Sequence, residues 1–171
     1  MKKLLLLLIL SVATLQPISA QSYRGFADIE AGYTFNLAGA LIGATTTHGV
    51  QLAQKFFIGA GTGILTDAGS GWCQSDIAIV IPLYADFRFD FFNGKKVSPF
   101  VDLKVGYTAD ITSADFGVSS GLYLKPTIGF RIRLTERTGI NIGLAYSHIN
   151  AVDNEWSITD NTISIKAGID F

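Results

Sequence analysis

The chain has 171 residues, of which 18 are glycine, 49% are hydrophobic and 16% are charged, and its formal net charge is −1. This length predicts a single domain, and the near-neutral charge excludes nucleic-acid binding through bulk electrostatics. Cys73 is the one cysteine of the sequence, which excludes an internal disulfide.

Residues 1–20 have the pattern of a cleaved secretory signal. Lys2 and Lys3 precede an unbroken apolar run that ends at Leu10, and small residues lead to Ala20. We therefore predict cleavage after Ala20, which leaves a mature domain over residues 21–171. No later run is apolar and long enough to span a bilayer as a helix, so a mature chain that enters a membrane must cross it as strands.

Apolar and polar side chains alternate with a period of two along the mature chain, which predicts β-strands because successive side chains of a strand point to opposite faces. In chain order, the predicted strands cover residues 23–36, 48–54, 56–65, 77–92, 97–110, 120–134, 140–147 and 162–171. The clearest is 77–92, where every second residue from Ile77 to Phe91 is apolar and charged residues fall between them. The weakest is 48–54, where only Val50 and Leu52 share an apolar face.

The connections between these strands alternate in length. Residues 37–47, 66–76, 111–119 and 150–161 are predicted loops, whereas the connections near residues 54–55, 93–96 and 135–138 are short. Asn93 and Gly94 form a tight-hairpin signal in one of the short connections. An even number of strands, each long enough to cross a bilayer at a tilt, with short turns at one end and longer loops at the other, is typical of outer-membrane barrels.

Charges are strictly sorted relative to the apolar rows, because none interrupts a row. A membrane would demand this exclusion, since a Lys or Arg that faces lipid at mid-depth costs roughly 2–4 kcal/mol. We therefore predict an all-β fold, an eight-stranded antiparallel up-and-down transmembrane β-barrel with its apolar rows toward lipid. The charges on the other face of the strands are Arg24, Asp28, Glu30, Asp86, Arg88, Asp90, Asp102, Lys104, Lys125, Arg131, Arg133, Lys166 and Asp170.

An eight-stranded barrel has an interior just wide enough for side chains to fill it. Six acids and seven bases make up the set predicted to face it, so we expect a paired ionic plug near neutrality, because buried charges must be paired and hydrogen-bonded. We expect Arg88, Arg131 and Arg133 to bridge the acids of this network, mainly as structure. Those acids are Asp28, Glu30, Asp86, Asp90 and Asp102.

Charges outside the strand interiors differ between the two predicted ends. The predicted loops and their edges carry only acids, namely Asp67, Asp76, Asp110, Asp115, Asp153, Glu155 and Asp160. The short turns carry Lys55, Lys95, Lys96 and Arg137, offset only by Glu136. The spacing of the loop acids matches no calcium loop, so we expect them to join anionic lipopolysaccharide through divalent ions and assign no metal site.

Several segments carry a family resemblance: FFIGAGTGI (56–64), IPLYADFRFDF (81–91), SPFVDLKVGY (98–107), GLYLKPTIGFRIRL (121–134) and the terminal aromatic Phe171. In these segments and in its leader, the chain resembles the small outer-membrane β-barrel domain proteins of Gram-negative bacteria, particularly the family common in the Bacteroidetes. The resemblance implies the barrel fold and a place in the cell outer membrane, and it does not imply a reaction. It also implies that Ile165, Ala167, Ile169 and Phe171 form the signal read by the outer-membrane insertion machinery. With the loop pattern, it places both termini in the periplasm and the long loops outside the cell.

Some small barrels are enzymes, namely lipid A deacylases and palmitoyl transferases. A deacylase needs a serine oxygen within hydrogen-bond reach of a histidine. Ser147 and His148 are neighbours on one strand and point to opposite faces, and His48 would reach Ser119 or Ser120 only if loops folded together. We therefore predict no catalytic residue and no cofactor, and expect a non-enzymatic protein of envelope integrity or surface interaction.

Three alternatives stay open at this point. Within the membrane the chain could be a lipid-modifying enzyme or a narrow pore, and in a different class it could be a secreted lipocalin-like barrel with its apolar rows around a ligand.

Pro82 and Pro126 fall inside strands, where each removes a ladder hydrogen bond, so we expect bulges there. An aromatic girdle is expected near the loop ends from Tyr33, Phe35, Trp72, Tyr107, Tyr146 and Trp156.

Overall fold

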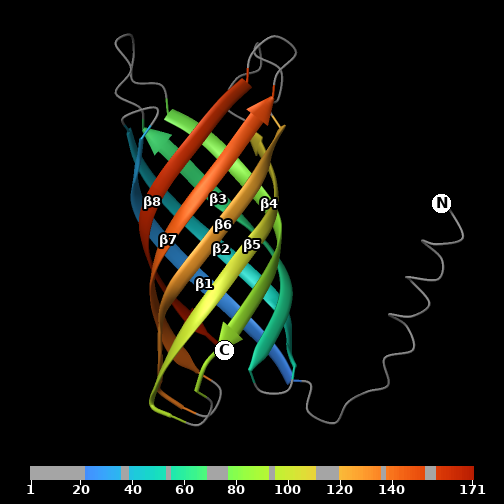
Figure 1. Ribbon diagram of the computed structural model, residues 1–171, viewed down its shortest axis with the longest axis vertical. Helices are drawn as coiled ribbons and strands as arrows, with labels where there is room; N and C mark the ends of the chain where they lie inside the picture. The colour runs from blue at the N-terminus through green and yellow to red at the C-terminus, as the bar shows by residue number, and fades with distance from the viewer. Residues whose placement is uncertain are drawn as a thin grey trace, which may run out of the picture.

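The computed structural model describes residues 22–35, 39–52, 55–68, 77–92, 95–110, 120–135, 138–152 and 157–171. These residues form one closed antiparallel barrel in which each strand pairs with its neighbours in the chain and β8 pairs with β1 (Figure 1). The strands are β1 (Ser22–Thr34), β2 (Gly39–Leu52), β3 (Phe56–Ala68), β4 (Ile77–Asp90), β5 (Val97–Asp110), β6 (Ser120–Arg133), β7 (Gly139–Val152) and β8 (Ser157–Asp170). The predicted fold class, an eight-stranded antiparallel β-barrel, is confirmed. In the described part of the chain, no helix has the length and apolarity to cross a membrane.

The barrel has two rims that differ in their connections. We call the end at which β2, β4 and β6 end the turn rim, and the end at which β1, β3, β5 and β7 end the loop rim. Because the number of strands is even, β1 begins and β8 ends at the turn rim, which is the lower end in Figure 1. The predicted secretory signal, residues 1–20, lies outside the described residues.

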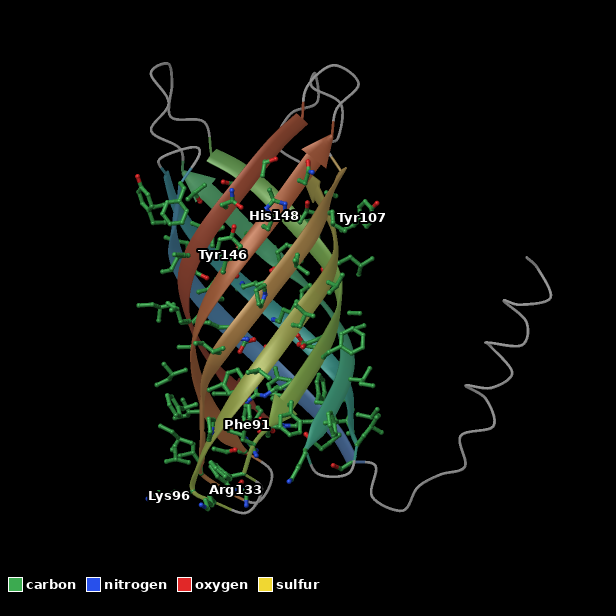
Figure 2. All side chains as sticks on the ribbon, in the orientation of Figure 1. Phe91, Lys96, Tyr107, Arg133, Tyr146 and His148 are labelled. Carbon is green, nitrogen blue, oxygen red and sulfur yellow. The ribbon has the colours of Figure 1, made fainter. Side chains whose placement is uncertain are left out.

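Exposure alternates along the strands in the predicted direction. On β4, Leu83 is 68% exposed on the outer surface, whereas Asp86 is 3% exposed inside the barrel. The same alternation holds on β6, where Ile128 faces out and Lys125 is buried in the lumen. The predicted apolar rows therefore cover the outside, and Figure 2 shows side chains projecting outward around the wall. A lipocalin-like barrel would place these rows inside, so that alternative is wrong for this fold.

The second strand is longer than predicted. β2 begins at Gly39, so most of the predicted loop at residues 37–47 is strand, paired with β1 from Gly39–Thr34 onward. Its outward residues mix Ala40 and Thr46 with the apolar Ile42, whereas Leu41 faces inward, so neither face was visible as an apolar row. Threonine nevertheless favours strands because its branched side chain fits the pleated surface.

The last hairpin also extends beyond its predicted limits. β7 continues to Val152 and β8 begins at Ser157, so the predicted loop at residues 150–161 shrinks to residues 153–156. Together with the short first connection at residues 35–38, this means that only residues 69–76 and 111–119 are longer connections at the loop rim. The predicted alternation of long and short connections is therefore only partly correct.

Pro82 and Pro126 interrupt the ladder without a bulge. Thr62 pairs with Leu83 and Leu65 pairs with Val80, so the register is continuous across Pro82 although the pairings between are missing. The same gap occurs between β6 and β7 at Pro126, while Pro126 still pairs with Leu103 on its other side. The expected bulges are therefore wrong, because a proline lacks a donor toward only one neighbour.

Glycines of β3 leave room for large lumen side chains, as expected for glycine on one face of a strand. A Cβ placed on Gly61 would lie 2.7 Å from the ring of Tyr84 and would collide with the carbonyl oxygen of Thr46. The Tyr84 ring therefore sits against the bare backbone of Gly61, and its hydroxyl lies 3.0 Å from the hydroxyl of Thr47.

We expect Gly61→Val to lower the free energy of unfolding by about 1–3 kcal/mol, because the added carbons displace Tyr84 and press on backbone that has no space. The measurement is urea unfolding in detergent micelles, followed by fluorescence. Ala60→Val is the matched control, because Ala60 is the preceding residue and faces outward. Equal unfolding free energies for the two variants would contradict this packing.

Candidate functional site

The lumen is the candidate functional site, because the charged side chains of the strands gather there. Asp170 of β8 is fully buried near the turn rim and forms the centre of one cluster. Its carboxylate accepts hydrogen bonds from Arg131 at 2.5 Å and from the side-chain amide of Asn141 at 3.0 Å. Arg24 lies 3.1 Å from the same carboxylate. One acid therefore neutralises guanidinium groups from β1 and β6.

Arg24 and Arg88 extend this cluster to the opposite wall. Arg24 is 2.8 Å from Asp90 and donates to the side-chain oxygen of Gln51 at 2.6 Å. Arg88 is 3.0 Å from Asp90 and donates to the side-chain oxygen of Asn141 at 2.6 Å. The carboxylates of Asp90 and Asp170 are thus joined through shared arginine and asparagine partners, as one network near the turn rim.

Aromatic rings cover the arginines of this network. The Arg88 guanidinium lies 3.6 Å from the ring centroid of Phe100 and 4.8 Å from that of Phe26. Arg24 lies 4.7 Å from the same Phe26 ring, and Phe57 packs edge-on against it at 4.9 Å. Ring faces attract cations most strongly where water is excluded, so these rings stabilise the buried guanidinium groups while they fill the lumen.

Lysines, and not arginines, hold the acids of the middle lumen. Lys166 lies 2.9 Å from Asp102 and 3.3 Å from Asp28, and Lys104 lies 3.4 Å from Asp28. Lys104 also donates to the hydroxyl of Tyr84 at 3.3 Å. These ammonium groups can each serve several acceptors because they are compact and carry three donors.

A further ion pair joins β1 and β6. Lys125 pairs with Glu30, and the hydroxyl of Ser164 donates to the same carboxylate at 2.9 Å. Close to it is an apolar cluster of Leu65, Tyr84 and Tyr123, against which Val80 and Ile149 pack. Ionic and apolar side chains together line the described part of the lumen.

The partners differ from those expected for the predicted arginines. Arg88 and Arg131 do pair with lumen acids, at Asp90 and Asp170, whereas Arg133 lies half-buried at the turn-rim end of β6. Among the described residues, Asp86 makes no ion pair, although β4–β5 pairing sets it opposite Lys104. The remaining predicted lumen residues, Arg24, Asp28, Glu30, Asp102, Lys125 and Lys166, all take part in the ion pairs described above.

Sequence reasoning missed the neutral members of the network. Gln51, Asn141 and Ser164 are buried and bond to charged side chains, yet none was proposed as part of the site. Their inward position in the alternation of their strands was the available signal for Asn141 and Ser164. Gln51 lies on β2, where the alternation was too weak to use.

The residues weighed for catalysis do not come together. Ser147 faces the lumen, whereas His148 faces outward and its Nδ1 lies 2.8 Å from the side-chain oxygen of Asn161. His48 lies on the outer surface near the turn rim, where it contacts Tyr23 and Phe171, and Ser120 begins β6 at the loop rim. Ser119 lies outside the described residues.

The predicted loop acids are mostly beyond what the structure describes. Asp76, Asp115, Asp153 and Glu155 lie outside the described residues, as do Cys73, Glu136 and Arg137, and the side chains of Asp67 and Asp110 are not described. Asp160 lies on β8 opposite Ile149. Within the described ranges, no three His, Cys, Asp or Glu side chains group closely enough to hold a metal ion.

The outer surface carries the residues proposed for membrane contact and insertion. Tyr33, Phe35, Tyr107 and Tyr146 are exposed on the outside, and Figure 2 shows Tyr107 and Tyr146 in the upper part of the barrel. Trp72 and Trp156 lie outside the described residues. Ile165, Ile169 and Phe171 are exposed on the same side, with Ala167 half-exposed, so the proposed insertion signal forms one outward row along β8.

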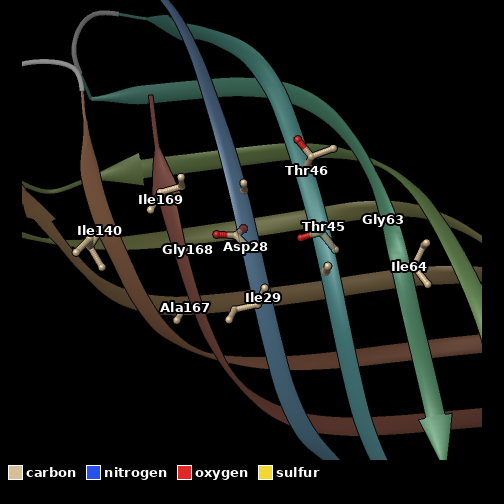
Figure 3. A pocket seen from close by; sticks show the side chains of 12 residues that line it. Asp28, Ile29, Thr45, Thr46, Gly63, Ile64, Ile140, Ala167, Gly168 and Ile169 are labelled. Atoms are coloured by element: carbon tan, nitrogen blue, oxygen red, sulfur yellow. The ribbon is translucent and has the colours of Figure 1, made fainter.

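A shallow groove of about 700 Å³ crosses β8, β1, β2 and β3 on the outside (Figure 3). It follows small residues such as Ala27, Ala44 and Ala167 and is bordered by Ile29 and Ile64. Its lining is apolar and it lies open to the surroundings, which suits hydrocarbon chains and excludes a buried polar ligand.

A closed eight-stranded barrel with an apolar exterior and an ionic lumen has the architecture of the small outer-membrane β-barrels. The fold is similar to that of Neisserial surface protein A, with a TM-score of 0.68 and 13% identity over 88% of this chain and 97% of that one. It is also similar to the outer membrane enzyme PagL, with a TM-score of 0.61 and 12% identity over 84% of this chain and 97% of that one. The N-terminal barrel domain of Pseudomonas aeruginosa OprF gives a TM-score of 0.50 and 14% identity, over 86% of this chain and 97% of that domain. No protein-family model matches the chain, and neither does any curated protein.

Proposed function

We propose that the chain is a non-enzymatic integral protein of the cell outer membrane, of the small barrel type common in the Bacteroidetes, which contributes to envelope integrity or surface interaction. The observation that carries the proposal is the inverted barrel. Buried charges such as Asp170 and Lys104 fill the inside, and residues such as Leu83 and Ile128 cover the outside. Water-soluble monomers rarely expose apolar patches larger than a few hundred Å², whereas hydrocarbon chains cover such a surface without cost.

The partners in this proposal are outer-membrane lipid, lipopolysaccharide and the outer-membrane insertion machinery, with no nucleic acid. Both termini of the mature chain lie in the periplasm and the loop rim faces outward, because the longer connections, at residues 69–76 and 111–119, lie at the rim opposite the two strand termini. Divalent ions join the acids of that rim to lipopolysaccharide. The lumen carries no substrate, because paired charges and aromatic rings occupy it.

The test begins with the whole chain expressed in a Gram-negative host. We expect it in the outer-membrane fraction, resistant to a urea wash, released only by detergent, and faster on a gel before boiling than after. Purified protein in planar bilayers should give no steady conductance, because the lumen is filled. Recovery in the soluble periplasm would contradict membrane insertion, and discrete conductance steps would contradict a filled lumen.

Deletion of the gene should raise the sensitivity of the cells to detergents and chelators, and unchanged sensitivity would reject the role in envelope integrity.

A further inference from the structure

The turn rim carries a group of exposed lysines that the lumen network does not use. Lys55 precedes β3, and Lys95 and Lys96 precede β5. All three side chains are exposed, and among the described residues none makes an ion pair. By contrast, among the residues that the structure describes, the acids closest to this rim, Asp90 and Asp170, are buried and already paired with arginines.

The backbone of this rim is held in place by the barrel. The carbonyl oxygen of Lys55 accepts a hydrogen bond from the backbone N–H of Asp90 at 2.9 Å. The carbonyl oxygen of Lys96 accepts one from the N–H of Arg133 at 2.8 Å. The turn positions therefore continue the strand ladder, and the lysine side chains extend from fixed points while their ammonium groups stay in solvent.

A contact with an aromatic ring sets the depth of Lys95. The Lys95 ammonium lies 4.4 Å from the ring centroid of Phe92, which is 47% exposed on the outer surface. Phe91 and Val97 are exposed beside the same turn, and Leu134 lies at the neighbouring one. An ammonium held against the last aromatic ring of an apolar band lies at the level of lipid headgroups. Figure 2 places Phe91 and Lys96 at this lower end of the barrel.

We propose that the turn rim is a binding surface for anionic glycerophospholipids, whose phosphate oxygens accept hydrogen bonds from Lys55, Lys95 and Lys96. The neighbouring apolar residues hold the acyl chains of the same lipid, which distinguishes it from a soluble phosphate. The loop rim has the opposite character, because the sequence places seven acids and no Lys or Arg at its connections and their edges. The inference goes beyond the proposed function and rests on it only for membrane insertion.

The experiment uses the full mature chain in nanodiscs made from an equal mixture of phosphatidylglycerol and phosphatidylcholine. The lipids that stay bound after release are counted by native mass spectrometry. We expect phosphatidylglycerol to be enriched over phosphatidylcholine on the wild-type chain, and the triple variant K55Q/K95Q/K96Q to lose about fivefold or more of that enrichment. Raising the salt should weaken the enrichment, because the lysines are exposed.

The control is K55R/K95R/K96R, which keeps the charge and should keep the enrichment. Retention of wild-type enrichment by the glutamine triple would overturn the inference. Competition by free glycerol phosphate as effective as that by the lipid would also overturn it, because the acyl chains would then add nothing. If the wild-type chain fails to insert, the proposed function fails as well. Insertion without a preference between the two lipids overturns the inference alone.

Discussion

Asp170→Ala is expected to lower the free energy of unfolding by about 3–5 kcal/mol, because it leaves buried positive charge without its partner. Asp170 is fully buried and holds Arg24, Arg131 and Asn141. Arg24 keeps Asp90 in the variant, whereas Arg131 loses the acid that it bonds through two nitrogen atoms. The measurement is urea unfolding of the barrel refolded in lipid vesicles, followed by the loss of its fast-migrating gel form.

One further variant separates charge from shape at this position, and a second removes a charge elsewhere as a control. Asp170→Asn keeps the size of the side chain and removes the charge, and we expect a loss nearly as large as for alanine. Lys96→Gln removes a charge from the exposed turn rim and should leave the unfolding curve almost unchanged. A loss below about 1 kcal/mol for both Asp170 variants would show that the lumen network does not stabilise the fold.

Ile128→Arg is expected to lower the free energy of unfolding in a bilayer by about 2–4 kcal/mol, because it places a guanidinium in hydrocarbon at mid-depth. Ile128 is 61% exposed and stands in the middle of the outward row of β6, which runs from Leu122 to Leu134. In a water-soluble barrel the same exposed position would accept arginine at little cost. The measurement is the unfolding free energy in vesicles compared with that of the wild type.

Leu134→Arg is the matched control, since Leu134 is 59% exposed just beyond the end of the same strand, at the turn rim. Arginine there reaches the headgroup region, and we expect a cost of about 0–1 kcal/mol. Equal costs at residues 128 and 134 would contradict the membrane assignment. The two positions are almost equally exposed, so water would give them similar unfolding costs, whereas a bilayer gives a larger cost at residue 128.

The fold was predictable from the sequence because a bilayer and an ionic lumen enforce opposite chemistry on alternate residues. The row from Ile77 to Phe91 is an example, since every charge near it falls on the inner face. The predicted strand limits were wrong in segments where neither face of the strand forms an apolar row. β2 carries Thr45, Thr46 and Thr47, which do not reveal a face, and the outer ends of β7 and β8 carry His148 and Asn161.

The content of the lumen was predictable, but its pairing was not. Lys104 on β5 meets Asp28 on β1, and Lys125 on β6 meets Glu30 on β1, so the partners come from strands that are not neighbours. Such contacts depend on the stagger of all eight strands around the closed barrel, which no local pattern records.

The ladder gaps at Pro82 and Pro126 make the wall mechanically uneven. Over those stretches, β3 lacks its links to β4, and β6 lacks its links to β7, while the remaining strand contacts keep the register. We expect lateral pressure from a surrounding bilayer to bend the barrel wall most easily at these two gaps, because each proline removes a ladder hydrogen bond there. The pairing on the other side of each proline, with Thr108 and with Leu103, holds the wall together.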